Sequence, residues 1–184
     1  AEIRSGKLKN IMVMMGGVDS ANTTHTVLKS LPHDLLKEND INVNVVVGEN
    51  YPYLQRLSKT CSDMRYNLYV QPENISTLML EADLAIGAAG SSSWERCCLG
   101  LPSIVVIVAE NQQMIGDVIA AEKCGISLNC GMENFEFFLS KAVQRIIHDP
   151  GLLQEFSANA FKMTSGEGAI LVAKGILKCL RSHS

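Results

Sequence analysis

The chain has 184 residues, of which 47% are hydrophobic and 19% are charged, and its formal net charge is −3. This length and composition are typical of one globular domain with a sizeable core. The small negative charge offers no general attraction to nucleic acid or anionic membranes, and the apolar runs are far shorter than the roughly 20 residues of a membrane span. With no basic-then-apolar leader, we expect a cytoplasmic protein without nucleic-acid or membrane partners.

The six cysteines do not indicate disulfides or a metal centre. Cys97 and Cys98 are adjacent, and no C-x-x-C pair occurs. A domain of this size also needs no covalent cross-links. We therefore expect reduced, buried cysteines that pack as small apolar residues, and we expect no metal ion and no cofactor.

Short β-branched runs alternate with longer amphipathic stretches, and most of these runs are apolar without alternation, as in strands covered on both faces. The predicted strands are Asn10–Met15, Ile41–Val47, Asn67–Val70, Leu84–Gly87, Ser103–Val108 and Ile126–Leu128. The predicted helices are Ala21–Ser30, Tyr51–Cys61, Ile75–Glu81, Ser93–Leu99, Gln113–Cys124, Glu133–His148, Gly151–Phe161 and Gly168–Leu180. This order predicts an α/β, Rossmann-like fold: an open parallel sheet of about six strands with helices on both faces.

Loops that follow strands are where ligands of such sheets bind. The loop after the first strand, Met15–Asn22, begins with two glycines that let the backbone come close to a ligand. Asp19 or Ser20 can cap the next helix, whose start favours an anion. A tight turn without any ligand would have the same sequence, so both interpretations stay open here.

The loop after the fourth strand, Gly87–Ser93 (GAAGSSS), is the stronger candidate for a ligand site. Its small residues leave room for phosphates, its hydroxyls add donors, and the helix that follows favours negative charge. Glu95, one turn into that helix, can accept both hydroxyls of a ribose. The alternative is a capped helix with a solvated glutamate. After the fifth strand, amides of Ala109–Gln113 could bind phosphate or sugar hydroxyls, or Asn111 could cap a helix.

No pattern in the chain indicates a catalyst. The spacing G-x-G-x-x-G and the triplet G-K-[ST] are both absent, and neither a G-x-S-x-G elbow nor a metal-binding spacing occurs. The histidines are placed on helices, beside a proline or in the tail, and none of them follows a strand: His25, His33, His148 and His183. We therefore predict a binding site with no catalytic residue.

The run Gly87–Pro102 (GAAGSSSWERCCLGLP) resembles the signature of the PseG family, the UDP-2,4-diacetamido-2,4,6-trideoxy-β-L-altropyranose hydrolases of pseudaminic acid biosynthesis. These enzymes are relatives of MurG with the two-domain GT-B fold. Five further segments resemble the same family in order: Met15–Ser20, Val47–Leu54, Tyr69–Ile75, Ala109–Gln113 and Thr164–Ala169. The resemblance implies that residues 10–184 are the UDP-binding C-terminal half of a GT-B enzyme, with residues 1–9 as a remnant of the interdomain linker.

Carried onto this sequence, the resemblance implies nine UDP-binding residues. The ribose hydroxyls are assigned to Glu95, and the uracil edge to backbone around Gln71 and Pro72. The diphosphate, with the sugar beside it, is assigned to Gly17, Gly90, Ser91, Ser92, Asn111 and Gln112.

The family's general-base histidine belongs to an N-terminal domain that this chain lacks, so the resemblance implies a fragment that binds UDP without turnover. The parent enzyme is expected to hydrolyse a UDP-linked diacetamido-trideoxy sugar for pseudaminic acid, surface polysaccharide or flagellin glycosylation, with the missing domain as partner. Two alternatives remain. The chain could be the donor-binding half of a MurG-like glycosyltransferase, or a nucleotide-binding module fused to a sialic-acid-type nucleotidylyltransferase.

Overall fold

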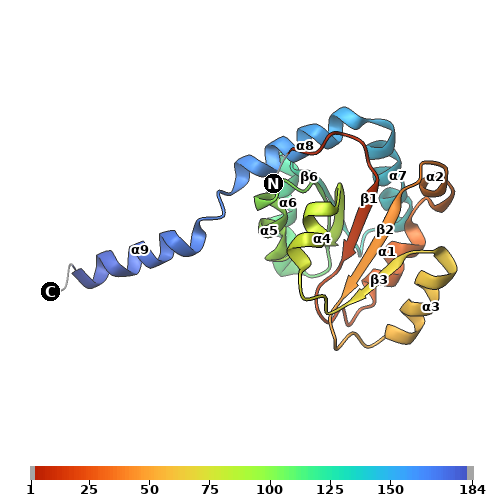
Figure 1. Ribbon diagram of the computed structural model, residues 1–184, viewed down its shortest axis with the longest axis horizontal. Helices are drawn as coiled ribbons and strands as arrows, with labels where there is room; N and C mark the ends of the chain where they lie inside the picture. The colour runs from red at the N-terminus through yellow and green to blue at the C-terminus, as the bar shows by residue number, and fades with distance from the viewer. Residues whose placement is uncertain (1–2, 182–184) are drawn as a thin grey trace.

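The computed structural model describes residues 3–181 (Figure 1), so residues 1–2 and 182–184, and with them His183, lie outside the described part. The strands are β1 (Asn10–Met14), β2 (Asn42–Val47), β3 (Asn67–Val70), β4 (Leu84–Ala88), β5 (Ser103–Ile107) and β6 (Gly125–Asn129). The α-helices are α1 (Thr23–Ser30), α2 (His33–Glu38), α3 (Leu54–Met64), α4 (Ile75–Glu81), α5 (Ser92–Cys98), α6 (Gln113–Ala121), α7 (Phe135–His148), α8 (Pro150–Met163) and α9 (Gly168–Arg181), and η1 (Glu110–Gln112) is a 3₁₀ turn.

The described strands form one parallel sheet in the order β3-β2-β1-β4-β5-β6. The chain leaves β1 toward β2 and β3 and then returns to the other side of β1 as β4. Connections therefore leave the carboxyl ends of β1 and β4 in opposite directions, which opens a crevice between them. In this pairing Met14 lies opposite Gly87.

Helices cover both faces of the sheet because successive buried strand residues point to opposite sides (Figure 1). Ile11 and Val13 belong to a core cluster with residues of α1, α3 and α7. Met12, between them, packs with residues of α4 on the other face. A third cluster joins β5 to α5, α6 and α8. The predicted Rossmann-like architecture is confirmed.

Two short elements were not predicted. Helix α2 has six residues and buries only Leu36, so it is too short for a helical period to show in the sequence. The 3₁₀ turn η1 includes Asn111, so Asn111 does not cap the next helix, which begins after Gln112. The expectation of buried cysteines is also wrong in part: Cys98 and Cys130 are half-buried, and Cys179 is exposed on α9.

The last helix, α9, projects away from the body (Figure 1) and leaves several large apolar side chains exposed. None of the helices within residues 3–181 combines the length and apolar character that a membrane span requires.

The segment that precedes β1 is packed, although its sequence is polar. Arg4 and Leu8 are buried, and the Arg4 amide donates to Ser157 Oγ of α8 at 3.0 Å. The Arg4 guanidinium donates to the carbonyls of Met79 and Ala82 at the end of α4 and to that of Leu99 after α5. Residues 3–9 are therefore part of the folded unit. Their role as a linker remnant stays a prediction.

Two histidines, His25 and His33, lie in surroundings that disfavour their protonated forms. His33 Nδ1 and the Tyr66 hydroxyl are 2.6 Å apart, and burial raises the pKa of Tyr66 to about 12, so the phenol keeps its proton. Burial lowers the pKa of His33, and burial together with the charges of Arg56 and Lys29 lowers the pKa of His25. Both imidazoles therefore resist protonation in the folded state.

We expect the melting temperature to fall as the pH falls below 6.5, the ordinary pKa of both histidines. The unfolded chain takes up these protons more readily, so the stabilisation is present above that pH and is lost on acidification. In the variant His25→Gln/His33→Gln, the decrease in melting temperature between about pH 7 and about pH 5 should be less than about half that of the wild type. Equal decreases, measured by circular dichroism, would contradict this assignment.

Candidate nucleotide-binding site

A cavity of 340 Å³ lies at the carboxyl end of the sheet, over the crevice between β1 and β4. Its walls come from the segments that follow β1, β2, β3 and β4, together with η1. The lining residues are Met14, Met15, Gly16, Gly17, Val46, Val47, Gly48, Gln71, Pro72, Ile75, Ala88, Gly90, Ser91, Ser92 and Gln112. This position is where ligands of open parallel sheets bind.

Glycines bring the cavity walls close together and keep its centre open. A Cβ atom on Gly48 would lie 2.3 Å from the carbonyl oxygen of Gly17, so the loops after β1 and β2 touch through backbone atoms. A Cβ atom on Gly17 or Gly90, by contrast, would meet nothing within 4 Å. Backbone at Gly17 and Gly90 is therefore accessible to a ligand.

The first backbone amides of α1 already have a negatively charged hydrogen-bond acceptor, the side chain of Asp19. The Asp19 carboxylate accepts hydrogen bonds from the amides of Thr23 and Thr24 at 2.9 and 2.8 Å. The expected cap is confirmed, but it occupies the helix start that was expected to favour an anion. Tyr51 and Tyr53 hold the same loop by donating to Asn22 Oδ1 at 2.6 Å and to the Ser20 carbonyl at 3.1 Å.

The wall after β3 is shaped by the backbone of Gln71, which has a left-handed φ of 47°. Its amide donates to the carbonyl of Val47 at 2.9 Å, and its side-chain oxygen accepts from the Glu49 amide at 3.4 Å. These two contacts tie the end of β3 to the end of β2. Pro72 then turns the chain along the cavity wall.

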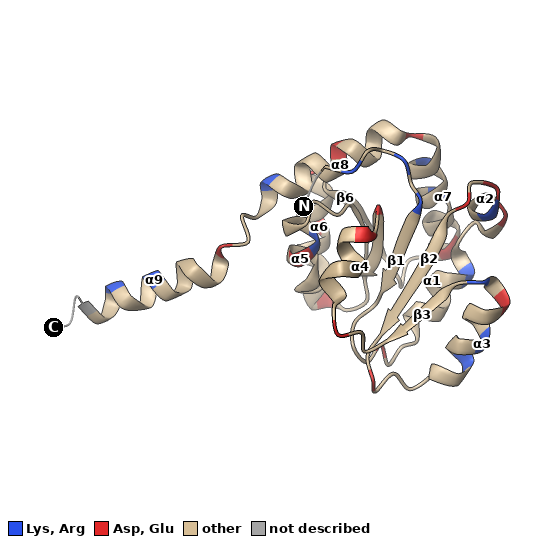
Figure 2. Ribbon diagram, viewed as in Figure 1, with Lys and Arg blue, Asp and Glu red and all other residues tan. Residues whose placement is uncertain are grey.

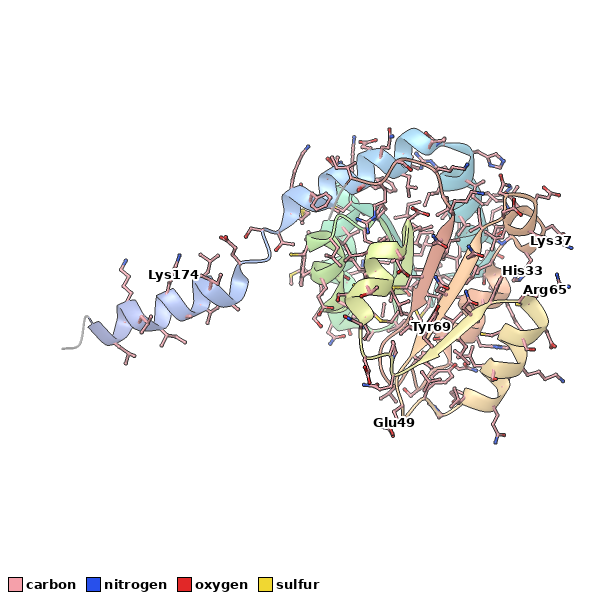
Figure 3. The ribbon with its side chains drawn as sticks, in the orientation of Figure 1. His33, Lys37, Glu49, Arg65, Tyr69 and Lys174 are labelled. Carbon is pink, nitrogen blue, oxygen red and sulfur yellow. The ribbon has the colours of Figure 1, made fainter. Side chains whose placement is uncertain are left out.

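The cavity lining contains no charged residue. Glu49 and Glu73, next in sequence to the lining residues Gly48 and Pro72, are exposed, and red segments mark the lower end of β2 and β3 in Figure 2. Figure 3 shows Glu49 at this end of the molecule, pointing away from the ribbon.

One cation lies behind the cavity wall. Arg96 of α5 is 1% exposed, and its Nη2 donates to the Ala88 carbonyl at 3.1 Å and to Ser93 Oγ at 2.8 Å. Its Nη1 donates to Ser92 Oγ at 3.3 Å. Burial lowers the pKa of Arg96 to about 10, so the side chain keeps its charge at neutral pH.

Seven of the nine predicted UDP-binding residues line the cavity: Gly17, Gln71, Pro72, Gly90, Ser91, Ser92 and Gln112. The Gln112 side-chain oxygen is engaged, since it accepts from the Val108 amide at 3.2 Å. Glu95 and Asn111 are exposed and do not belong to the lining. The assigned role of each residue stays a prediction.

The sequence interpretation missed Gly48 and Arg96 as parts of the site. Gly48 follows β2, so the rule that ligands bind after strands could have identified it. Arg96 gives no such signal, because an arginine on a short amphipathic helix is usually solvated.

A larger hollow of 720 Å³ lies at the amino end of the sheet, between α2 and the end of α3. It includes His33, Lys37 and Arg65, which Figure 3 shows at the opposite end of the molecule from Glu49. Amino ends of parallel strands are not where such sheets bind ligands, so we assign the site to the smaller cavity. Within residues 3–181, no three His, Cys, Asp or Glu side chains gather where they could hold a metal ion.

Comparison with known proteins identifies the family of this domain. Residues 10–170 match the glycosyltransferase family 28 C-terminal domain. The chain belongs to this family. The family 28 C-terminal domain is thus nearly coextensive with the sheet and its covering helices.

Two relatives and one solved structure illustrate the range of this family 28 domain. SpsG, a spore coat polysaccharide biosynthesis protein of Bacillus subtilis, is 26% identical over 89% of the chain. The UDP-N-acetylglucosamine–N-acetylmuramyl-(pentapeptide) pyrophosphoryl-undecaprenol N-acetylglucosamine transferase of Gloeobacter violaceus is 23% identical over 93%. The co-structure of S. aureus MnaA with UDP superposes on 95% of the chain and 47% of that protein, with a TM-score of 0.71 at 12% identity.

The chain spans about half the length of these curated relatives, 48% of each. The fold is that of a GT-B C-terminal half, as expected: the crystal structure of Acinetobacter baumannii MurG superposes on 95% of the chain and 51% of that protein, with a TM-score of 0.69 at 19% identity. The relation to MurG is also supported, whereas membership of the PseG hydrolases is not. The matched family and the Gloeobacter relative are glycosyltransferases, so the alternative of a transferase donor half agrees better with these matches than the hydrolase does.

Proposed function

We propose that this chain is the donor-binding domain of a GT-B glycosyltransferase and that its cavity binds the UDP part of a nucleotide sugar. The observation that carries the proposal is the position and make-up of the cavity. It lies over the crevice between β1 and β4 and is lined by open glycine backbone and serine hydroxyls. Backbone amides and hydroxyls are the groups that bind phosphates at such loops.

The uridine nucleotide is proposed on the strength of the relatives. One of them transfers N-acetylglucosamine from a UDP-linked donor by its name, and a structure with the same fold contains UDP. Within the cavity, we assign the diphosphate to Gly17 and Gly90–Ser92 and the uracil to the backbone at Gln71 and Pro72. Glu95 and Asn111 would reach a ligand that extends beyond the cavity, toward the ribose and the sugar.

The variant Gly90→Ala tests the site directly. We expect it to fold normally, because the added methyl group meets no protein atom within 4 Å, and to bind UDP about 10- to 100-fold more weakly. Gly168→Ala is a matched control, since Gly168 lies on α9 outside the cavity lining and also has open space around it. Calorimetry with UDP measures both. No heat with UDP at millimolar concentration would contradict the proposed function, and an unchanged affinity in Gly90→Ala would contradict the site.

A hydrolase would use the same donor domain, and the run Trp94–Cys98 is the feature that favours it, through its resemblance to PseG. Acceptor choice in GT-B enzymes belongs to the other half, so the two functions differ outside this chain. The discriminating test therefore uses a protein that joins this domain to its other half: incubated with UDP-N-acetylglucosamine in plain buffer, a transferase should bind the donor without UDP release. Steady release of UDP with no acceptor present would favour the hydrolase.

A further inference from the structure

The buried Arg96 side chain forms no ion pair with any of the residues that the structure describes. Within residues 3–181, no carboxylate oxygen lies within 4.0 Å of its nitrogens, and Nε has no hydrogen-bond partner. A charge removed from water in this way is costly unless another charge compensates it.

The guanidinium lies directly under the floor of the cavity. A Cβ atom on Gly87 would stand 2.5 Å from Arg96 Nη1 and 2.8 Å from the carbonyl oxygen of Met14. The absence of a side chain at Gly87 thus provides the space for the guanidinium. Gly87 pairs with Met14 across β4 and β1, and Met14 lines the cavity. The positive charge is therefore placed where the two strands end.

Ser92 connects this charge to the cavity. Its Oγ accepts the hydrogen bond from Arg96 Nη1, so its own hydroxyl hydrogen is free for another acceptor. Ser92 lines the cavity, in which no residue is charged and only neutral donors can meet a ligand. A cation behind a layer of small residues acts more strongly than one in water, because the intervening dielectric is low.

We propose that Arg96 is a positioning residue for the diphosphate: its buried charge offsets the phosphates, and its hydrogen bond turns the Ser92 hydroxyl toward them. The inference rests on the proposed function and deepens it. Gly87, Ser92 and Arg96 then form one unit, in which the glycine makes room for the cation and the serine transmits its effect. A bound diphosphate would add negative charge to that of Glu95, which already favours the charged guanidinium.

The test compares uridine, UMP and UDP, which differ only in their phosphates. In Arg96→Met, we expect UDP to bind at least about tenfold more weakly and uridine to change by less than about threefold, because charge-assisted interactions are lost only with phosphates. Arg96→Lys keeps the positive charge but loses the planar guanidinium, so its affinity for UDP should fall less than that of Arg96→Met. The exposed Arg145→Met on α7 is the control and should bind all three ligands as the wild type does.

A double-mutant cycle tests the role of Ser92. Ser92→Ala should weaken UDP binding in the wild type and have less effect in Arg96→Met, because the two residues act on the same phosphates. Additive losses would contradict the coupling. Equal losses for uridine, UMP and UDP in Arg96→Met would show a structural role only and overturn the inference. If Arg96→Met does not fold, the same comparison of UDP and uridine affinities in Arg96→Lys and Ser92→Ala tests the inference. A wild type that binds none of the three contradicts the proposed function itself.

Discussion

Replacement of Arg4 by alanine is expected to lower the free energy of unfolding by about 3 kcal/mol, because carbonyl groups at two helix ends lose a buried donor. The guanidinium bonds Met79 and Ala82 at the end of α4 and Leu99 after α5. It also interacts favourably with the negative ends of both helices. Truncation leaves these carbonyls buried without water, and it removes the packing of the long side chain.

Urea denaturation of Arg4→Ala and of the surface variant Arg145→Ala measures this difference. The surface variant should stay within about 0.5 kcal/mol of the wild type. A loss below about 1 kcal/mol in Arg4→Ala would mean that the segment before β1 is dispensable for the fold. UDP affinity of the remaining folded protein should be close to that of the wild type, because Arg4 is not among the cavity-lining residues.

The second large effect is expected for Gly48→Ala, which should weaken UDP binding by about 10- to 100-fold. The added Cβ would lie 2.3 Å from the Gly17 carbonyl oxygen and 2.9 Å from its carbon, and both are backbone atoms that no rotamer change can move. The loop after β1 must therefore shift away from the loop after β2. That shift displaces backbone proposed to contact the diphosphate.

Gly48→Ala differs from Gly90→Ala in its mechanism and therefore in its readouts. At Gly90 the methyl group enters open cavity space, so only ligand binding should suffer. At Gly48 the wall itself moves, so a lower melting temperature of the ligand-free protein should accompany the weaker binding. Normal UDP affinity in Gly48→Ala would mean that the position of the Gly16–Gly17 backbone does not matter for the ligand.

The strand positions were predictable because strands that are buried on both faces have continuous apolar sequences. Ile104, Val105 and Val106 of β5 are all buried, and such unbroken apolar runs can be recognised without knowledge of the fold. The small residues after β4 were predictable for a similar reason, since GAAGSSS exceeds what a helix cap requires. Helix α2 has no comparable sequence pattern, because one buried leucine cannot show the spacing of apolar residues that is typical of a helix.

The sequence by itself determined the Rossmann-like class of the sheet and the loops that we propose as a ligand site, because both depend on residues close together in the chain. Only the tertiary structure decided which loops meet, since the pairing of β4 beside β1 brings Gly90 to Gly17 across more than 70 positions of the chain. It also decided the environment of two arginines. Arg4 is buried by hydrogen bonds to helix ends far away in the chain, and Arg96 is buried against Gly87 at the end of β4.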